Sequence, residues 1–254
     1  NGLVYDANVH APNLASTSLL TTRYSAAIDA LATTEAPARD INIVVSARTN
    51  ATLRAYLRAH AILASSAGLT RRAIIAPGLD TTTLSAAFGD ASPGVGANRN
   101  DRVDYAWPGY QQFVQEALGV AVTKADGSAP ADGILDTPAD VLLACVEANI
   151  RPEENPGKAT APVPGLTSRV LGFQSNLTAG TMDGSAYVQA RSYGVAALRY
   201  EPSISTYVFQ SGVTTSLQTG EKNIARRRMA DFIQDSIANA MTQFCKELLT
   251  EDLK

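Results

Sequence analysis

Two short apolar runs separated by a helical pattern constrain the fold of this chain most strongly. Residues 41–45 (INIVV) and 72–76 (RAIIA) are rich in β-branched residues, which is typical of buried strands. Between them, Leu53, Leu57 and Ala61 recur at helical spacing. A strand that returns to its sheet after one crossover helix runs parallel to the first strand. The sequence therefore predicts an α/β fold built on a βαβ unit.

The rest of the chain adds helices and strands to this unit. Helices are predicted over 21–32, 81–88 and 184–193, and strands over 102–107, 195–200, 205–210 and 212–216. Another helix opens with Thr137 as its cap and Pro138 at its first position. Residues 110–118 fit either a strand or a helix, and 89–100 and 124–136 have loop composition. The expected architecture is a mixed sheet with a βαβ core flanked by helices.

A C-terminal α+β region ends in the most strongly patterned segment, a long amphipathic helix over 221–249. Its apolar stripe has a period of 3.6 residues and consists of Met229, Ile233, Ile237, Ala240, Met241, Phe244 and Leu248. The segment 151–166 contains four prolines and two glycines and marks a boundary or long crossover. We therefore expect an α/β domain over 1–166 and a C-terminal region over 167–254, packed together or as one composite domain.

Composition excludes several functional classes. With 254 residues, 45% of them hydrophobic and 18% charged, the chain can bury a substantial core. A net charge of -3 argues against nucleic acid as the main partner. Every uncharged apolar run is shorter than the roughly 18 residues of a membrane helix, so no membrane partner is expected.

No catalytic, cofactor or metal site is predicted. The loop Gly94-Val95-Gly96 resembles half of a dinucleotide-binding fingerprint, but it lies in a long loop without the third glycine. Cys145 and Cys245 fall on apolar faces of predicted helices, and the only histidines, His10 and His60, make no zinc-site spacing with them.

Two carboxylate pairs, Glu153 with Glu154 and Asp101 with Asp104, lie in loop and strand-edge contexts. We interpret them as solvated charges.

One dense cluster of charge opens the last helix, and it consists of Lys222, Arg226, Arg227 and Arg228. Arg227 and Arg228 lie one turn and three residues before Asp231, which predicts local ion pairs. Arg226 lies seven residues before Ile233 and therefore falls on the apolar stripe itself. An arginine there pairs with a buried acid, extends to solvent or meets an anionic surface of another chain.

Residues 167–249 resemble the tail sheath proteins of contractile bacteriophages and related contractile injection particles. The resemblance rests on a helix that ends in the step Gly194-Val195, a strand pair followed by Gly212, and a long helix that contains Arg226 to Arg228. Upstream, the βαβ unit, a strand ending near Trp107-Pro108 and the Pro/Gly-rich segment 155–158 follow the family's order, which extends the resemblance to residues 20–249.

This resemblance implies a structural protein, not an enzyme, that works without a cofactor. Sheath subunits polymerise as helical rings around a tail tube and contract to drive the tube through the host envelope for genome ejection. The implied partners are other sheath subunits and the tail tube protein, and the implied location is the phage tail of the virion, after assembly in the bacterial host cytoplasm. In the family, a helix of the C-terminal region faces the tube. We therefore expect the end formed by Lys222, Arg226, Arg227 and Arg228 to meet an acidic tube surface.

Sheath proteins usually have an N-terminal arm and a C-terminal arm that join neighbouring subunits. The chain starts at Asn1 and ends at Lys254 without either, so we expect a trimmed core that is monomeric in isolation if the arms carry the lattice. Two alternatives remain open: an enzyme on an α/β scaffold, such as a hydrolase, and a small-ligand binding module that uses the loop 89–100.

Overall fold

The computed structural model describes residues 17–31, 41–45, 50–113, 134–158, 170–178 and 181–251. Their helices and strands, in chain order, are α1 (Thr17–Ala30), β1 (Ile43–Val45), α2 (Ala51–Ser66), β2 (Arg72–Ile75), α3 (Leu84–Phe88), the 3-10 helix η3 (Val95–Asn98), β3 (Val103–Trp107), β4 (Tyr110–Phe113), β5 (Ile134–Thr137), α4 (Ala139–Asn149), β6 (Val170–Phe173), α5 (Gly184–Tyr193), β7 (Ala196–Glu201), β8 (Thr206–Phe209) and α6 (Ile224–Glu251).

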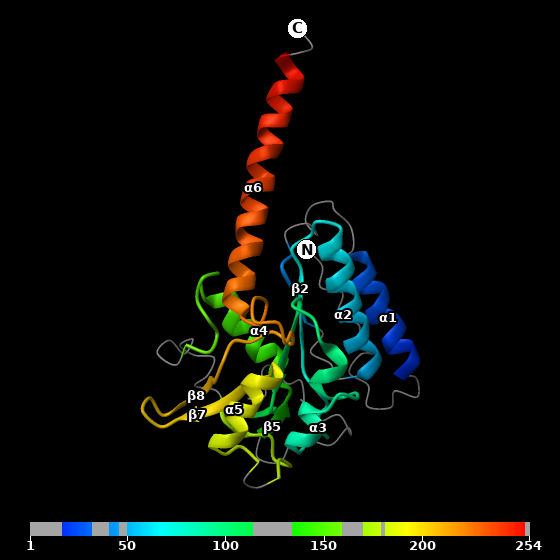
Figure 1. Ribbon diagram of the computed structural model, residues 1–254. Helices are drawn as coiled ribbons and strands as arrows, with labels where there is room; N and C mark the ends of the chain where they lie inside the picture. The colour runs from blue at the N-terminus through cyan, green and yellow to red at the C-terminus, as the bar shows by residue number, and fades with distance from the viewer. Residues whose placement is uncertain are drawn as a thin grey trace.

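A five-stranded sheet in the order β1-β2-β3-β7-β8 organises the fold (Figure 1). The strands β1, β2, β3 and β7 are parallel, and β8 returns antiparallel to β7. The helix α2 is the crossover between β1 and β2, so the predicted βαβ unit and the mixed α/β fold are confirmed. Because β7 pairs with β3, the segments on either side of the predicted boundary at 151–166 share one sheet.

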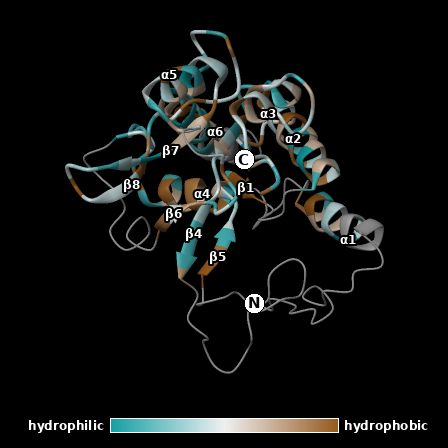
Figure 2. Ribbon diagram, turned by 90° about the horizontal axis from the view of Figure 1, so that it is seen from below, coloured by the Kyte–Doolittle hydropathy of each residue, from teal (hydrophilic) through white to brown (hydrophobic). Residues whose placement is uncertain are grey.

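Both faces of the sheet are covered, which explains why every residue of β2 and β3 is buried. Ala73 and Ile75 enter one apolar cluster with residues of α1, α2, α3 and α5. Ile74 enters a second cluster, on the opposite face, with residues of α4 and β6. In Figure 2, α4 is mostly hydrophobic along its length, whereas β4 is mostly hydrophilic.

Local signals set the ends of the crossover helix α2. The Asn50 side chain accepts the backbone N–H of Thr52 at 2.8 Å and so caps the helix start. After the helix, Gly68 adopts a positive φ of 87°, which a residue with a side chain rarely adopts, and the chain turns into β2.

A second, antiparallel sheet in the order β5-β4-β6 corrects two expectations. Thr137 does not cap α4: it pairs with Tyr110 in the sheet, and its hydroxyl accepts a hydrogen bond from Gln112 at 3.0 Å. Pro138 takes the cap position of α4 and has no side chain that could cap it. Residues 110–113 of the ambiguous segment form β4, while 114–133, including most of the expected loop 124–136, lie outside the described residues.

The segment that leads into α6 is not the regular strand expected over 212–216. It makes only isolated bridges, from Thr214 to Asp104 and from Val213 to Asn223. Asn155 fixes the segment from across the chain, because its Oδ1 accepts the N–H of Gly212 at 2.8 Å and its Nδ2 donates to the carbonyl of the same residue at 3.1 Å. The described part of the predicted crossover, 151–158, therefore packs against the start of α6.

Candidate interaction site at the long helix

The helix α6 leaves the body of the protein and extends well beyond it (Figure 1). Only its base is buried: Ile224 is fully covered, and Ala225 nearly so. The N–H of Ile224 donates to the carbonyl of Gly212 at 3.2 Å, and the Oδ1 of Asn223 accepts the N–H of Arg226 at 3.3 Å as a helix cap. The first turn is therefore fixed to the segment that precedes it.

One side of α6 faces the body and carries charged side chains. Asp231 is buried and accepts two hydrogen bonds from one Arg102 nitrogen, at 2.7 and 2.8 Å. Arg227, one turn earlier, pairs with the same carboxylate at 3.1 Å and with Asp101 at 3.0 Å. One turn later, Asp235 accepts a 2.5 Å hydrogen bond from the Thr70 hydroxyl. Ion pairs and hydrogen bonds thus attach α6 to the ends of β2 and β3.

Arg228 attaches α6 to a second helix. Its Nη2 donates to the carbonyls of Glu147 and Ile150, at 2.7 and 2.9 Å. These carbonyls lie at the C-terminal end of α4, where a cation is favourable because the helix leaves carbonyls unpaired and a partial negative charge there. Burial, opposed by the charge of Glu147, lowers the pKa of Arg228.

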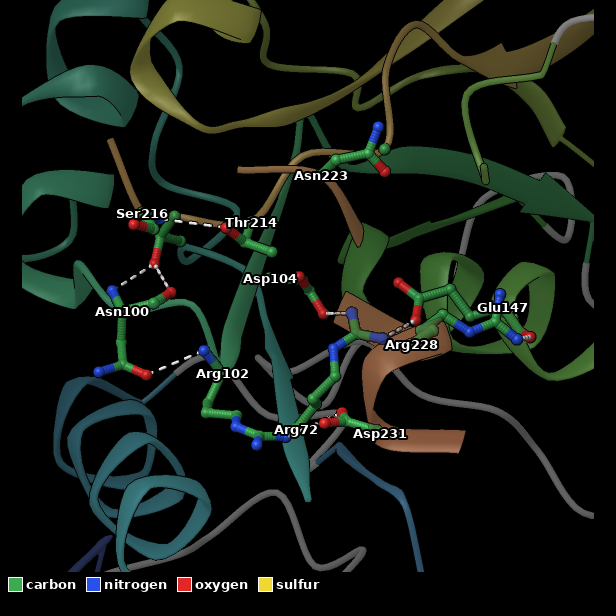
Figure 3. A network of polar contacts seen from close by, with 12 residues as sticks. Arg72, Asn100, Arg102, Asp104, Glu147, Thr214, Ser216, Asn223, Arg228 and Asp231 are labelled. Carbon is green, nitrogen blue, oxygen red and sulfur yellow. Dashed lines mark hydrogen bonds and ion pairs between the residues drawn. The ribbon is translucent and has the colours of Figure 1, made fainter. Parts of the chain in front are cut away.

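Beneath this contact lies a fully buried charge network, shown in Figure 3. Arg72 of β2 forms ion pairs with Asp104 of β3 and, at 3.0 Å, with Glu147 of α4. Burial by itself would lower the pKa of Arg72, but the two carboxylates raise it above its ordinary value. Burial raises the pKa of Asp104 to about 8, although Arg72 opposes the rise. Since Asp104 has no exposed surface, the interpretation of this residue as a solvated charge is wrong.

The face of α6 opposite Asp231 and Asp235 is apolar and uncovered. At 3.6 residues per turn, Ile233 and Ile237 lie across the helix from these two aspartates. Ile237 is 58% exposed and Met241 is 56% exposed. The exposed apolar side chains on this face, which we call the outward stripe, are Met229, Ile233, Ile237 and Met241; the exposed Phe232, next to Asp231, projects from the flank of the helix.

Of the four basic residues that the sequence analysis identifies at the start of α6, three bind other parts of the protein and one is exposed. Lys222 donates to the carbonyl of Ser192 at 2.8 Å, and Arg227 and Arg228 make the internal contacts above. The expected pair between Arg227 and Asp231 is present, whereas Arg228 binds carbonyls of α4 instead of Asp231. Arg226 is exposed at the base of the outward stripe, and no ion pair joins it to the described residues.

Sequence reasoning missed Arg72, Arg102 and Glu147 as parts of this site. Two members of the network could have been predicted from the sequence. Arg72 and Asp104 are charged residues within apolar strands, and their charges have opposite signs. Two such strands side by side in a covered sheet require the charges to meet.

In the loop 89–100, which the sequence offers as a ligand-binding alternative, backbone N–H groups form hydrogen bonds to carbonyls of the same loop. The N–H of Gly94 donates to the carbonyl of Ala91 at 2.7 Å, and the N–H of Gly96 donates to that of Gly89 at 2.9 Å. A Cβ at Gly94 would lie 2.2 Å from the carbonyl oxygen of Gly89, so the glycine permits a close backbone approach.

Residues of the predicted enzyme alternative lie apart. His60 is buried on α2 beside Arg71, at 3.1 Å, and burial together with that arginine lowers its pKa. Cys145 lies on α4, across the sheet from α2. Among the described residues, no group of three or more His, Cys, Asp or Glu side chains could hold a metal ion. Within the same ranges, no helix has both the length and the apolar character needed to span a membrane.

Comparison with known proteins gives a similarity in fold. No protein-family model matches the sequence, and no curated protein matches it. A chain in the cryo-EM structure of the anti-feeding prophage (AFP) baseplate, 6-fold symmetrised, is similar to this chain, with a TM-score of 0.50 and 12% sequence identity. The similarity covers 77% of this chain and 44% of that chain, so this chain spans less than half of its neighbour's length. At this identity the similarity concerns the fold.

Proposed function

We propose that this chain is a sheath-type subunit of a contractile, phage-tail-like particle, which polymerises around a tail tube and contracts to drive the tube through a host envelope. The fold similarity to a chain of the anti-feeding prophage baseplate supports a structural role in such a machine. The resemblance of residues 167–249 to tail sheath proteins favours the sheath within that class.

The observation that carries the proposal is the orientation of α6. Its polar side is bound to the body through Asp231 and Arg228, and its apolar side faces outward. None of the residues that the structure describes covers this apolar side, so contact with another chain would bury it. This arrangement suits a subunit whose work is done by contacts with its neighbours.

The attachment of α6 also suits the transmission of force. Arg102 precedes β3, and Arg72 and Asp104 lie on neighbouring central strands, so a load on α6 passes into the middle of the sheet. In a contractile lattice, the energy is the difference in packing between two arrangements of such rigid subunits. The subunit itself then needs no reaction or cofactor.

Of the four basic residues expected to contact the tube, one remains available for that contact. Lys222, Arg227 and Arg228 are engaged within the subunit, whereas Arg226 is exposed. We propose that Arg226 is the member of the cluster that meets an acidic tube surface, while the others fix the angle at which α6 leaves the body.

Electron microscopy of the full-length protein tests the sheath assignment. We expect tubular polymers of uniform width. Rings that do not lengthen into tubes would favour a second candidate, a baseplate subunit, which the source of the neighbouring structure supports. A protein that stays unassembled and is missing from purified particles would contradict both.

The proposed tube contact has its own test. Arg226→Glu in the full-length protein should prevent sheath assembly on tubes without affecting folding, because the side chain has no ion pair among the described residues to lose. Arg191→Glu, an equal charge reversal at an exposed position on α5, is the matched control and should assemble normally. Normal assembly of the Arg226→Glu protein on tubes would count against the contact.

A further inference from the structure

We propose that the outward stripe of α6 binds the same stripe of a second copy of this chain, so that two α6 helices pair side by side and antiparallel. The inference rests on the geometry and charge of α6 and does not depend on the proposed function. It departs from the expectation of a monomer, which assigned association to arms outside this chain.

The first argument is the composition of the helix beyond its base. Between residues 232 and 241 the only charged side chain is Asp235, and this residue turns toward the body to accept a hydrogen bond from Thr70. A solvent-exposed helix is ordinarily stabilised by charged pairs on its surface, which this segment lacks. Helical segments without such pairs or packing are only marginally stable in water. The segment is therefore built to be covered.

The second argument is available area. Four large apolar side chains, each roughly half exposed, offer on the order of 100 Å² apiece, or about 800 Å² over two copies. This value lies below the area that stable protein interfaces bury. We therefore expect a weak, concentration-dependent dimer.

The third argument is charge, which selects both the partner and the orientation. The outward stripe has Arg226 at one end and no acid among its described residues, since Asp231 and Asp235 face the body. An acidic surface finds a partner only at Arg226, at the base of the helix, whereas a second uncharged stripe is complementary to the apolar part of the stripe along its length. A parallel pair would place the two Arg226 side chains next to each other, while an antiparallel pair separates them to opposite ends. Antiparallel helices also align their dipoles favourably.

The shape of the protein permits this arrangement. The outer part of α6 extends past the other elements (Figure 1). The outward stripe lies across the helix from Asp231 and Asp235, which bind the body through Arg102 and Thr70. Two copies can therefore lay their helices together with the bodies at opposite ends. In a particle, another subunit would gain access to this face only after the pair separates.

Sedimentation equilibrium of this chain, from low micromolar to several hundred micromolar, tests the pairing. We expect a monomer–dimer equilibrium that Ile237→Lys weakens at least about tenfold, because the lysine would be buried in the pair. The matched control Asn239→Lys adds the same charge on the other side of α6 and should leave association within about threefold of the original. Since both positions are exposed, both variants should fold, which circular dichroism verifies. A monomer at every concentration, or a dimer that Ile237→Lys leaves unchanged, would overturn the proposal.

Disulfide trapping tests the orientation, in a background where Cys145→Ser and Cys245→Ser remove the native thiols. Chains with Met229→Cys should not crosslink to one another, because an antiparallel pair separates the two helix bases. A mixture of Met229→Cys and Met241→Cys chains should form the mixed disulfide. Efficient crosslinking between two Met229→Cys chains would show a parallel pair and refute the antiparallel arrangement. Particle assembly by the full-length protein is a separate measurement, so either proposal can fail without the other.

Discussion

The helices α4 and α6 are both amphipathic, yet they turn their apolar faces in opposite directions. α4 lies on the sheet, and Leu142 and Leu143 are almost completely buried. α6 turns its charged side to the body, and Ile237 stays 58% exposed. A helical period therefore shows that an apolar face exists, while the partners of the polar face decide where the apolar face points.

Polar partners explain the difference. For α6, Arg102 and Thr70 at the ends of β3 and β2 bind the aspartates of one side and fix that side against the body. For α4, the charged Glu147 lies within the buried side and is matched by Arg72 beneath it. The core around α4 is completed within one chain, whereas no residue in the described ranges covers the outward stripe of α6.

The largest predicted effect comes from breaking the charge network under α4. Asp104→Ala leaves Arg72 buried with one carboxylate, and it should lower the free energy of unfolding by about 3–5 kcal/mol, measured by urea denaturation above the raised pKa of Asp104, where that carboxyl is ionised. Asp101→Ala is the matched control at the base of α6, where the ion pair with Arg227 is partly exposed and contributes about 0–1 kcal/mol. Equal losses from the two variants would refute the distinction between the two helices.

A slightly smaller effect separates the two apolar faces directly. Leu143→Ala opens a cavity between α4 and the sheet and should cost about 3 kcal/mol of unfolding free energy. Ile237→Ala removes a similar side chain from the outward stripe and should change the stability of dilute protein by less than about 0.5 kcal/mol. If Ile237→Ala were as destabilising as Leu143→Ala, the outer part of α6 would have to be packed against its own chain.

Much of the fold follows from local sequence signals. The β-branched runs at 41–45 and 72–76, the Asn50 cap and the Gly68 stop each act within a few residues, and the structure contains all of them. The strand β5 was missed because its evidence is nonlocal: residues 134–137 follow a polar stretch and become a strand by pairing with β4.

The candidate site shows the same limit. The pair between Arg227 and Asp231 is one helical turn long and is predictable, but the pair between Arg102 and Asp231 joins residues 129 positions apart. The period of α6 identifies the outward stripe and places Arg226 on it. The direction of the stripe depends on the distant partner of Asp231, which no local pattern contains.

The pH dependence of stability should differ between two aspartates at helix starts, the buried Asp140 of α4 and the exposed Asp183 before α5. Asp140 is buried, and burial raises its pKa to about 6, although the N–H of Val141 opposes the rise. A raised pKa in the folded state means that the ionised form is penalised, so stability falls as the pH rises from about 4 through 6. Asp140→Asn should therefore increase the unfolding free energy by about 2 kcal/mol at pH 8 and leave it nearly unchanged at pH 4.

The control for this prediction has the opposite sign. Asp183 caps α5 at the surface, and hydrogen bonds from Ser185 and the N–H of Ala186 lower its pKa. Asp183→Asn should reduce stability at neutral pH, and the difference should disappear as the pH falls through the lowered pKa. Thermal melts across this range measure both variants. A stabilising effect of Asp140→Asn that is the same at pH 4 and pH 8 would exclude titration of Asp140 as its cause.

The smallest predicted effect concerns the point where α6 leaves the body. Thr70→Val removes the hydrogen bond to Asp235 while keeping the shape of the buried side chain, so it should cost about 1 kcal/mol. Because this contact holds the helix one turn beyond Asp231, amide hydrogen exchange should accelerate in α6 after residue 231 and stay unchanged in β2 and β3. Ser236→Ala is the control, since that hydroxyl donates to the carbonyl of Phe232 within the same helix and not to the body. Acceleration spread evenly over the sheet and α6 would mean that the helix and the core unfold as one unit, and that the polar contacts at its base do not form a separate attachment.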